Sequence, residues 1–125
     1  MKIVSKMYKI RKDLLFDFAL EAIKELGYKF DRIDKNSGLI AFETGLSWKS
    51  WAGQRISVMI LEHGNSTEIS ISGVRKQTGV IVQLYDWGEA KSIANKVIQK
   101  IDELIVAERY GLSSEDLERL KKDFF

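Results

Sequence analysis

The chain of 125 residues contains no cysteine and no proline. Without cysteine it cannot form disulfides, iron–sulfur clusters, thiolate zinc sites or a cysteine nucleophile. Without proline, every interruption of a helix or strand must come from glycine, asparagine, aspartate or charge. No apolar stretch approaches the roughly 20 residues that a membrane-spanning helix needs. These absences exclude thiol-based metal and redox sites and a transmembrane helix.

An excess of either charge is also missing. Lysine and arginine number 20 against 18 acidic residues, so the net charge is only +2, too balanced to indicate nucleic-acid or membrane binding by itself. With 45% hydrophobic and 30% charged residues, the composition is typical of one globular domain. The segment Met1–Lys6 contains no apolar signal core, so we expect a cytoplasmic protein.

The sequence carries no motif of a known catalytic or cofactor site. Neither glycine-rich phosphate loop, G-x-G-x-x-G or G-x-x-x-x-G-K-[ST], occurs, and neither does an HExxH metal motif or a G-x-S-x-G nucleophile elbow. His63 is the only histidine and falls in an expected turn, so we interpret it as a surface residue. We therefore predict no catalytic, cofactor-binding or metal-binding residues.

The first segments of the chain predict a strand followed by a helix. Residues 2–10 alternate loosely in hydropathy and carry three lysines, which is typical of an edge strand. Asp13 is a suitable N-cap, and apolar residues recur at helical spacing over residues 13–26. Gly27 follows where a left-handed C-cap residue is expected.

Four later segments have the composition and alternation of strands, at residues 28–34, 39–44, 54–62 and 67–74. Turn signals lie at residues 36–38 and 63–65. Ile56, Val58 and Ile60 share one face of the third segment, which predicts an antiparallel sheet with one buried face.

A long helix is expected after the strands. Asp86 is a suitable N-cap with Glu89 as its capping-box partner, and the helix extends to about Arg109. Its apolar stripe consists of Ile93, Val97, Ile101, Leu104 and Ile105. Residues 76–85 fit a strand, a loop or the start of this helix. Gly111 ends the helix, and Ser113 or Ser114 caps a short final one.

The predicted fold class is α+β, with an antiparallel sheet of four or five strands, two helices on one face and a short C-terminal helix. The order is β-α-β-β-β-β-α, and we divide the chain into an α+β domain (1–110) and a helical tail (111–125). This order resembles the TATA-binding-protein-like arrangement seen in many small bacterial domains. The resemblance implies a fold and almost nothing about function.

The tail GLSSEDLERLKKDFF resembles the end of the bacterial SHOCT module, a short C-terminal unit with a glycine, an acidic pair and two final apolar residues. It departs from that pattern at Leu117, where the module usually has an aromatic, and at Phe124 and Phe125, where it has leucines. The resemblance implies self-association through Leu112, Leu117, Leu120, Phe124 and Phe125. The alternative is a tail that folds back on its own domain.

The sheet face away from the helices is the expected partner surface. By alternation it presents Lys29, Asp31, Leu39, Ala41, Glu43, Arg55, Ser57, Met59, Leu61, Ser70 and Ser72. The candidate contact residues are Leu39, Ala41, Arg55, Met59 and Leu61, with Trp48 and Trp51 from the loop before the strand expected at residues 54–62. The alternative is that residues 76–85 or the tail pack on this face and bury it. The two tryptophans fit either stacking on bases or packing over the sheet end.

Two further groups of residues carry alternative interpretations. Residues 2–12 contain five cations and no acid, which fits a nucleic-acid or anionic-lipid patch as well as a soluble edge strand. The carboxylates of the expected strands would serve a hydrolase only if two of them met at working distance. They are Asp31, Asp34, Glu43, Glu62 and Glu68.

Three functional hypotheses follow. The leading one is a non-enzymatic domain that self-associates and binds a protein partner without a cofactor. The second is a module that binds nucleic acid or an anionic membrane through Lys6, Lys9, Arg55 and the tryptophan loop. The third is a small hydrolase.

Overall fold

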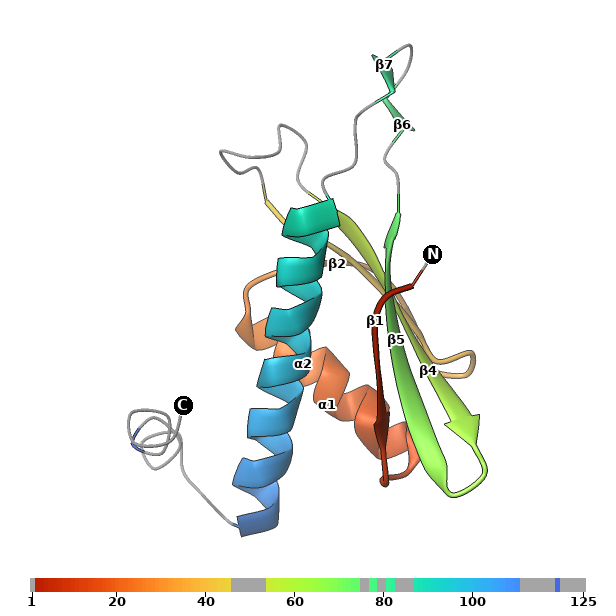
Figure 1. The fold of residues 1–125 in the computed structure, drawn as a ribbon, viewed down its shortest axis with the longest axis vertical. Coiled ribbons are helices and arrows are strands. Elements are labelled where there is room, and N and C mark those ends of the chain that lie inside the picture. Colours follow the sequence, from red (N-terminus) through yellow and green to blue (C-terminus); the bar gives the residue numbers. More distant parts are fainter. Residues whose placement is uncertain are drawn as a thin grey trace.

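A computed structural model describes residues 2–45, 54–74, 77–78, 81–82, 87–110 and 119 (Figure 1). The elements are β1 (Lys2–Tyr8), α1 (Lys12–Glu25), β2 (Lys29–Asp34), β3 (Leu39–Glu43), β4 (Arg55–His63), β5 (Ser66–Val74), β6 (Gln77–Thr78), β7 (Ile81–Val82) and α2 (Trp87–Tyr110). This order confirms the predicted α+β fold.

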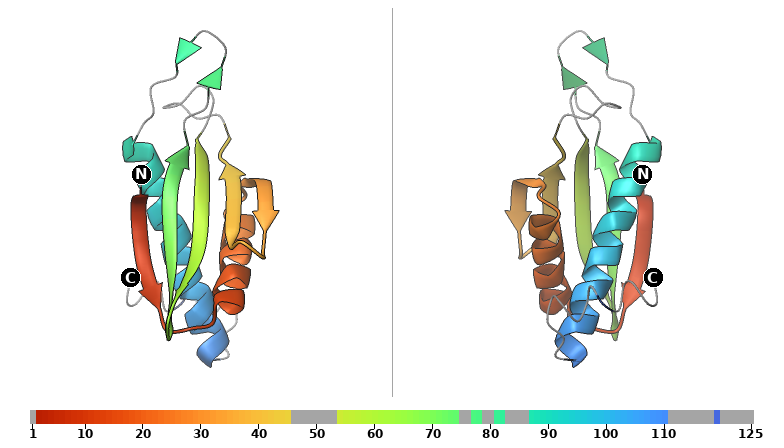
Figure 2. Two further views of the ribbon diagram at one scale, coloured as in Figure 1. Left: turned by 90° about the vertical axis from the view of Figure 1, so that its right-hand side faces the viewer. Right: turned by 90° about the vertical axis from the view of Figure 1, so that its left-hand side faces the viewer.

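Within the described residues, five strands form one antiparallel sheet in the order β1-β5-β4-β3-β2. Both α1 and α2 lie on one face of this sheet (Figure 1), and Figure 2 shows the opposite face in front of them, uncovered by either helix. Although β1 and β2 are consecutive strands, they form opposite edges, because α1 crosses the sheet between them. The predicted placement of two helices on one face is confirmed.

The core lies between the sheet and the two helices. The strands contribute side chains that alternate along each strand, as predicted, and these are Ile40, Phe42, Ile56, Val58, Ile60, Ile69 and Ile71. From α2 the buried residues include Ile93, Val97 and Ile101 of the predicted stripe. The buried face of α1 includes Leu15, Ala22 and Ile23, and Phe16 is fully buried there whereas Phe18 is only partly buried.

The start of α1 differs from the prediction. The N-cap is Arg11, whose backbone is extended and whose side chain makes no capping hydrogen bond. Asp13 is therefore not the N-cap but lies in the first turn, with its carboxylate 3.5 Å from the Arg11 Nε atom. An acidic residue in the first turn interacts favourably with the helix dipole, which explains its position there. At the other end, Gly27 has a φ of +79° and confirms the predicted left-handed residue.

Residues 76–85 contain two short paired strands, since Gln77–Thr78 pairs with Ile81–Val82 in a separate two-stranded sheet. The predicted Asp86 cap, Trp48, Trp51 and the apolar residues of the tail lie outside the described residues. No helix in the described part of the chain is long and apolar enough to cross a membrane.

Candidate functional site

The outer face is the side of the sheet that neither helix covers, and the register places the predicted surface residues on it together. Leu39 of β3 lies opposite Met59 of β4, and Ala41 lies opposite Ser57. Arg55 lies opposite Glu43 at one end of the same pair of strands. The alternation in the sequence therefore located these side chains on one face.

An apolar band crosses the outer face, and we define it as Met7, Leu39, Met59 and Leu61. Met7 of β1 and Leu61 of β4 both lie opposite Glu68 of β5, one on each side of it. The side chains of Met7 and Leu61 are 50% and 36% exposed, and Leu39 and Met59 are partly buried. Sequence reasoning missed Met7, because the loose alternation of residues 2–10 did not fix which face it occupies.

The charged side chains of the outer face are engaged with one another. The Arg55 Nη2 atom lies 2.8 Å from the Asp31 Oδ2 atom, and its Nε atom lies 3.5 Å from the Glu43 Oε1 atom. We expected Arg55 to be available to a partner, but the bulge in β2 brings Asp31 to it. The guanidinium group is therefore neutralised within the domain and is a poor candidate for binding a nucleic-acid phosphate.

His63 also has a partner on this face. Its Nε2 atom lies 2.9 Å from the Glu68 Oε1 atom, and the Glu68 side chain is only 10% exposed. The imidazole itself is 51% exposed, in agreement with its interpretation as a surface residue. A carboxylate with so little exposure needs polar contacts, and His63 supplies one of them.

The candidate acidic residues have separate structural contacts. Asp31 and Glu43 share Arg55, and Glu68 contacts His63. Asp34 accepts a hydrogen bond from the backbone N–H of Ser37, and this bond lowers the pKa of the Asp34 carboxyl. The described residues include no group of three or more histidine and acidic side chains that could hold a metal ion.

The basic N-terminal stretch is divided between two places in the structure. Lys6 points to the helix side, where its Nζ atom lies 2.7 Å from the Asp102 Oδ2 atom of α2. The Tyr8 hydroxyl donates to the Asp102 Oδ1 atom, also at 2.7 Å. Burial and this hydrogen bond raise the pKa of Tyr8. Lys6 therefore joins β1 to α2 through this ion pair.

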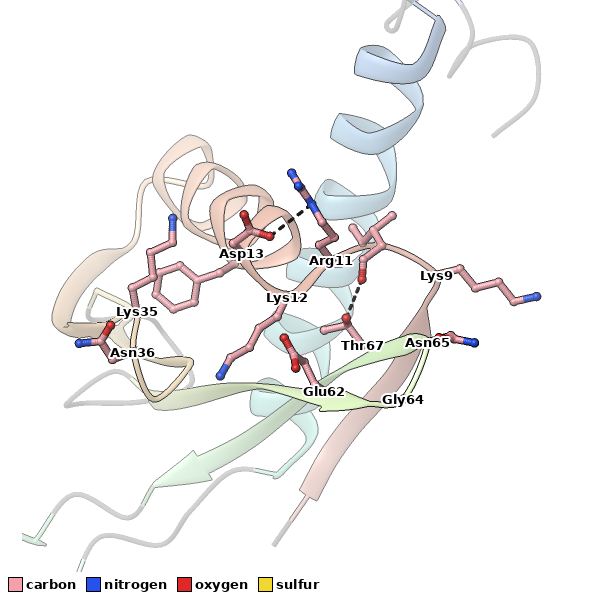
Figure 3. Close-up of a pocket in the computed structure, with 12 residues that line it drawn as sticks. Lys9, Arg11, Lys12, Asp13, Lys35, Asn36, Glu62, Gly64, Asn65 and Thr67 are labelled. Carbon is pink, nitrogen blue, oxygen red and sulfur yellow. Dashed lines mark hydrogen bonds and ion pairs between the residues drawn. The ribbon is translucent and has the colours of Figure 1, made fainter.

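Three other cations of that stretch, Lys9, Arg11 and Lys12, line a cavity of about 680 Å³ at one end of the sheet (Figure 3). The β1–α1 connection, the β2–β3 turn and the β4–β5 hairpin all contribute to its wall. The charged side chains that line it are Lys9, Arg11, Lys12, Asp13, Lys35 and Glu62. The structure thus adds Lys35 and its neighbour Asn36 to the basic stretch, which sequence reasoning missed because the two segments are distant in the chain.

Two of these cations are paired. Arg11 lies beside Asp13, and the Lys35 Nζ atom lies 2.9 Å from the Asp17 Oδ1 atom. Lys9 and Lys12 have no ion-pair partner within the described residues. The cavity therefore has free positive charge in its wall, beside neutralised pairs.

Comparison of the chain with models of protein families and with curated protein sequences found no match. The resemblances to TATA-binding-protein-like domains and to the SHOCT module therefore rest on the sequence alone.

Proposed function

We propose that the domain is a non-enzymatic self-association module, in which the outer face of one copy packs against the outer face of a second copy. The observation that supports this proposal is the apolar band of Met7, Leu39, Met59 and Leu61 on a face that neither helix covers. Apolar side chains on an open sheet face are characteristic of binding surfaces. Arg55 and Glu68, which lie beside these apolar residues, are already paired with Asp31 and His63, which suits the low net charge at the centre of a protein interface.

The size of the face is sufficient for a specific dimer. Neighbouring strands are roughly 4.8 Å apart and a nine-residue strand is roughly 30 Å long, so the face of the sheet offers about 500 to 700 Å². Two such faces would bury more than about 1,000 Å² in total, the lower limit for a stable specific interface. Face-to-face packing of two sheets is a common way to bury such surfaces.

The edges of the sheet are less suited to association than its face. The pairing of β1 with β5 shifts register between Lys2 and Val4, and the pairing of β2 with β3 shifts between Phe30 and Arg32. Bulges at edge strands discourage the addition of a further strand. A symmetric contact between two outer faces, which matches like surface with like, is therefore the arrangement that we favour.

The test compares two lysine substitutions of equally exposed apolar residues. Leu61 on the outer face and Val106 on α2 are both 36% exposed. The molar mass of each full-length variant is measured by size-exclusion chromatography with light scattering, from roughly 10 µM to 1 mM. We expect the unmodified chain and Val106→Lys to approach twice the monomer mass with rising concentration, and Leu61→Lys to remain monomeric.

A third variant separates the outer face from the tail. Leu117→Lys combined with Phe124→Lys removes the apolar side of the SHOCT-like segment in the full-length chain. A monomeric unmodified chain at the highest concentration would refute self-association. Loss of the dimer in the tail variant but not in Leu61→Lys would show that the tail, and not the outer face, makes the contact.

A further inference from the structure

The cavity at the end of the sheet contains a cation, Lys12, that has no ion-pair partner within the described part of the chain. Lys12, the first residue of α1, extends toward the strand that carries Glu62 in Figure 3. Its Cε atom lies 3.1 Å from the position that a Cβ atom would occupy on Gly38, so the β2–β3 turn confines its stem. Lys9 also lines the cavity, but its side chain points away from Lys12 in Figure 3. The lysine that would contact an anion is therefore held in place by the turn.

The cavity also offers groups that bind hydroxyls. Glu62 has no ion-pair partner within the described residues, and Asn36 and Asn65 line opposite sides of the cavity (Figure 3). The floor is fixed, because the Thr67 hydroxyl donates to the Ile10 carbonyl oxygen at 2.6 Å and so joins β5 to the β1–α1 connection. At about 680 Å³ the space lies within the range of small-molecule sites, roughly 300 to 1,000 Å³, and greatly exceeds the needs of an isolated phosphate ion.

We propose that this cavity binds a small ligand that carries a phosphate group and sugar hydroxyls, the combination shared by sugar phosphates and nucleotides. A phosphate monoester has close to two negative charges and three acceptor oxygens, which suit the ammonium group of Lys12. Glu62 accepts hydrogen bonds from hydroxyl groups, and it would repel a ligand that is only anionic. The mixed charge of the wall therefore favours this class over a bare anion, and the site is independent of the outer face.

The test is a titration of the full-length chain, followed by two-dimensional ¹H–¹⁵N NMR at about 50 mM salt, where screening is modest. The probes are ribose 5-phosphate, adenosine monophosphate, ribose and inorganic phosphate. We expect saturable shifts of the amide signals of Lys12, Asn36 and Asn65 with the first two probes and none with ribose. Tighter binding of adenosine monophosphate would identify the nucleotide as the source, and tighter binding of ribose 5-phosphate the sugar phosphate.

Three variants assign the contacts. Lys12→Gln keeps the length of the side chain and should weaken ribose 5-phosphate binding about tenfold. Lys24→Gln, on the exposed last turn of the same helix, should leave binding unchanged. Glu62→Gln should weaken ribose 5-phosphate but not inorganic phosphate. The dispersion of the amide signals in the same spectra shows that each variant is folded.

Several results would overturn the proposal. One is the lack of saturable amide shifts at about 10 mM ribose 5-phosphate, since this concentration would detect even weak binding. Another is that Lys12→Gln and Lys24→Gln bind ribose 5-phosphate with equal affinity. Inorganic phosphate that binds as tightly as ribose 5-phosphate would refute the role assigned to Glu62 and to the sugar hydroxyls.

Discussion

Gly38 lies at the end of the β2–β3 turn. It is the position where we expect a single added methyl group to lower the stability of the fold most. Its φ is +79°, and a Cβ atom built there would lie 2.3 Å from the carbonyl oxygen of Ile60 in β4. The carbonyl oxygen of Gly38 accepts a hydrogen bond from the Ile60 N–H at 2.8 Å, so the two backbones are drawn together at this point. Gly38→Ala therefore meets both an unfavourable backbone conformation and a collision with a central strand.

The two contributions can be added approximately. The left-handed conformation costs an alanine about 1 kcal/mol. Relief of the collision requires β4 to move, which weakens the hydrogen bond to Ile60 and loosens its fully buried side chain, together about 2 to 3 kcal/mol. The sum of about 3 to 4 kcal/mol lowers the melting temperature of a domain of this size by about 12 to 16 °C.

Gly27→Ala is the matched control. Gly27 has the same φ of +79°, but a Cβ atom there would have nothing within 4 Å. We expect this variant to lose only about 1 kcal/mol of unfolding free energy, which lowers the melting temperature by about 4 °C. Both variants are compared with the unmodified chain by urea unfolding and by thermal scans of circular dichroism at 222 nm. Equal losses in the two variants would show that the close approach of Gly38 to β4 contributes nothing, and the reasoning would be wrong.

Two further predictions concern the pH dependence of stability. The raised pKa of Tyr8 means that, above pH 10, the unfolded chain releases a proton that the folded chain retains, so stability falls as pH rises. Absorbance at 295 nm should show Tyr8 ionising only on unfolding, and Tyr8→Phe should reduce the alkaline loss; an unchanged loss would contradict the role of its bond to Asp102. Because the pKa of Asp34 is lowered in the folded chain, its carboxylate stabilises the fold at pH values above its ordinary pKa. This stabilisation is lost as the pH falls through the pKa of Asp34 in the folded chain. Asp34→Ala should therefore destabilise the chain at pH 7 more than at pH 2 in urea unfolding, and equal effects at both pH values would argue against the bond to Ser37.

The fold was largely predictable because period-two alternation determines which side chains of β4 and β5 face the helices. Ile56, Val58 and Ile60 are buried and Met59 lies on the opposite face, as alternation requires. The helix face was less predictable. Phe16 and Phe18 are both aromatic and two residues apart, and only the position of α1 against the sheet selects Phe16 for the core.

The surroundings of the charged residues were not predictable from local sequence. Arg55 is neutralised by Asp31 because a bulge in β2 shifts the register by one residue, and such a shift leaves no mark in the hydropathy pattern. Lys35 joins the cavity because β2 returns to the edge of the sheet that lies beside the start of α1. Interactions between distant segments decided both outcomes, whereas alternation and turn residues report only on neighbours in the chain.

The position of β1 at the edge beside β5 has a consequence for the order in which the chain folds. The hydrogen bond from Thr67 to Ile10 spans 57 residues and that from Tyr8 to Asp102 spans 94, whereas the pairings among β2, β3, β4 and β5 all join strands that are neighbours in sequence. Closing a loop of that first length costs about 2 kcal/mol more than closing a hairpin. Of the five strands of the sheet, β1 is made before the others and we expect it to be fixed last, so that until it docks the edge of β5 stays unpaired. We expect the interval before β1 docks to be the stage of folding at which this sheet is most prone to aggregate.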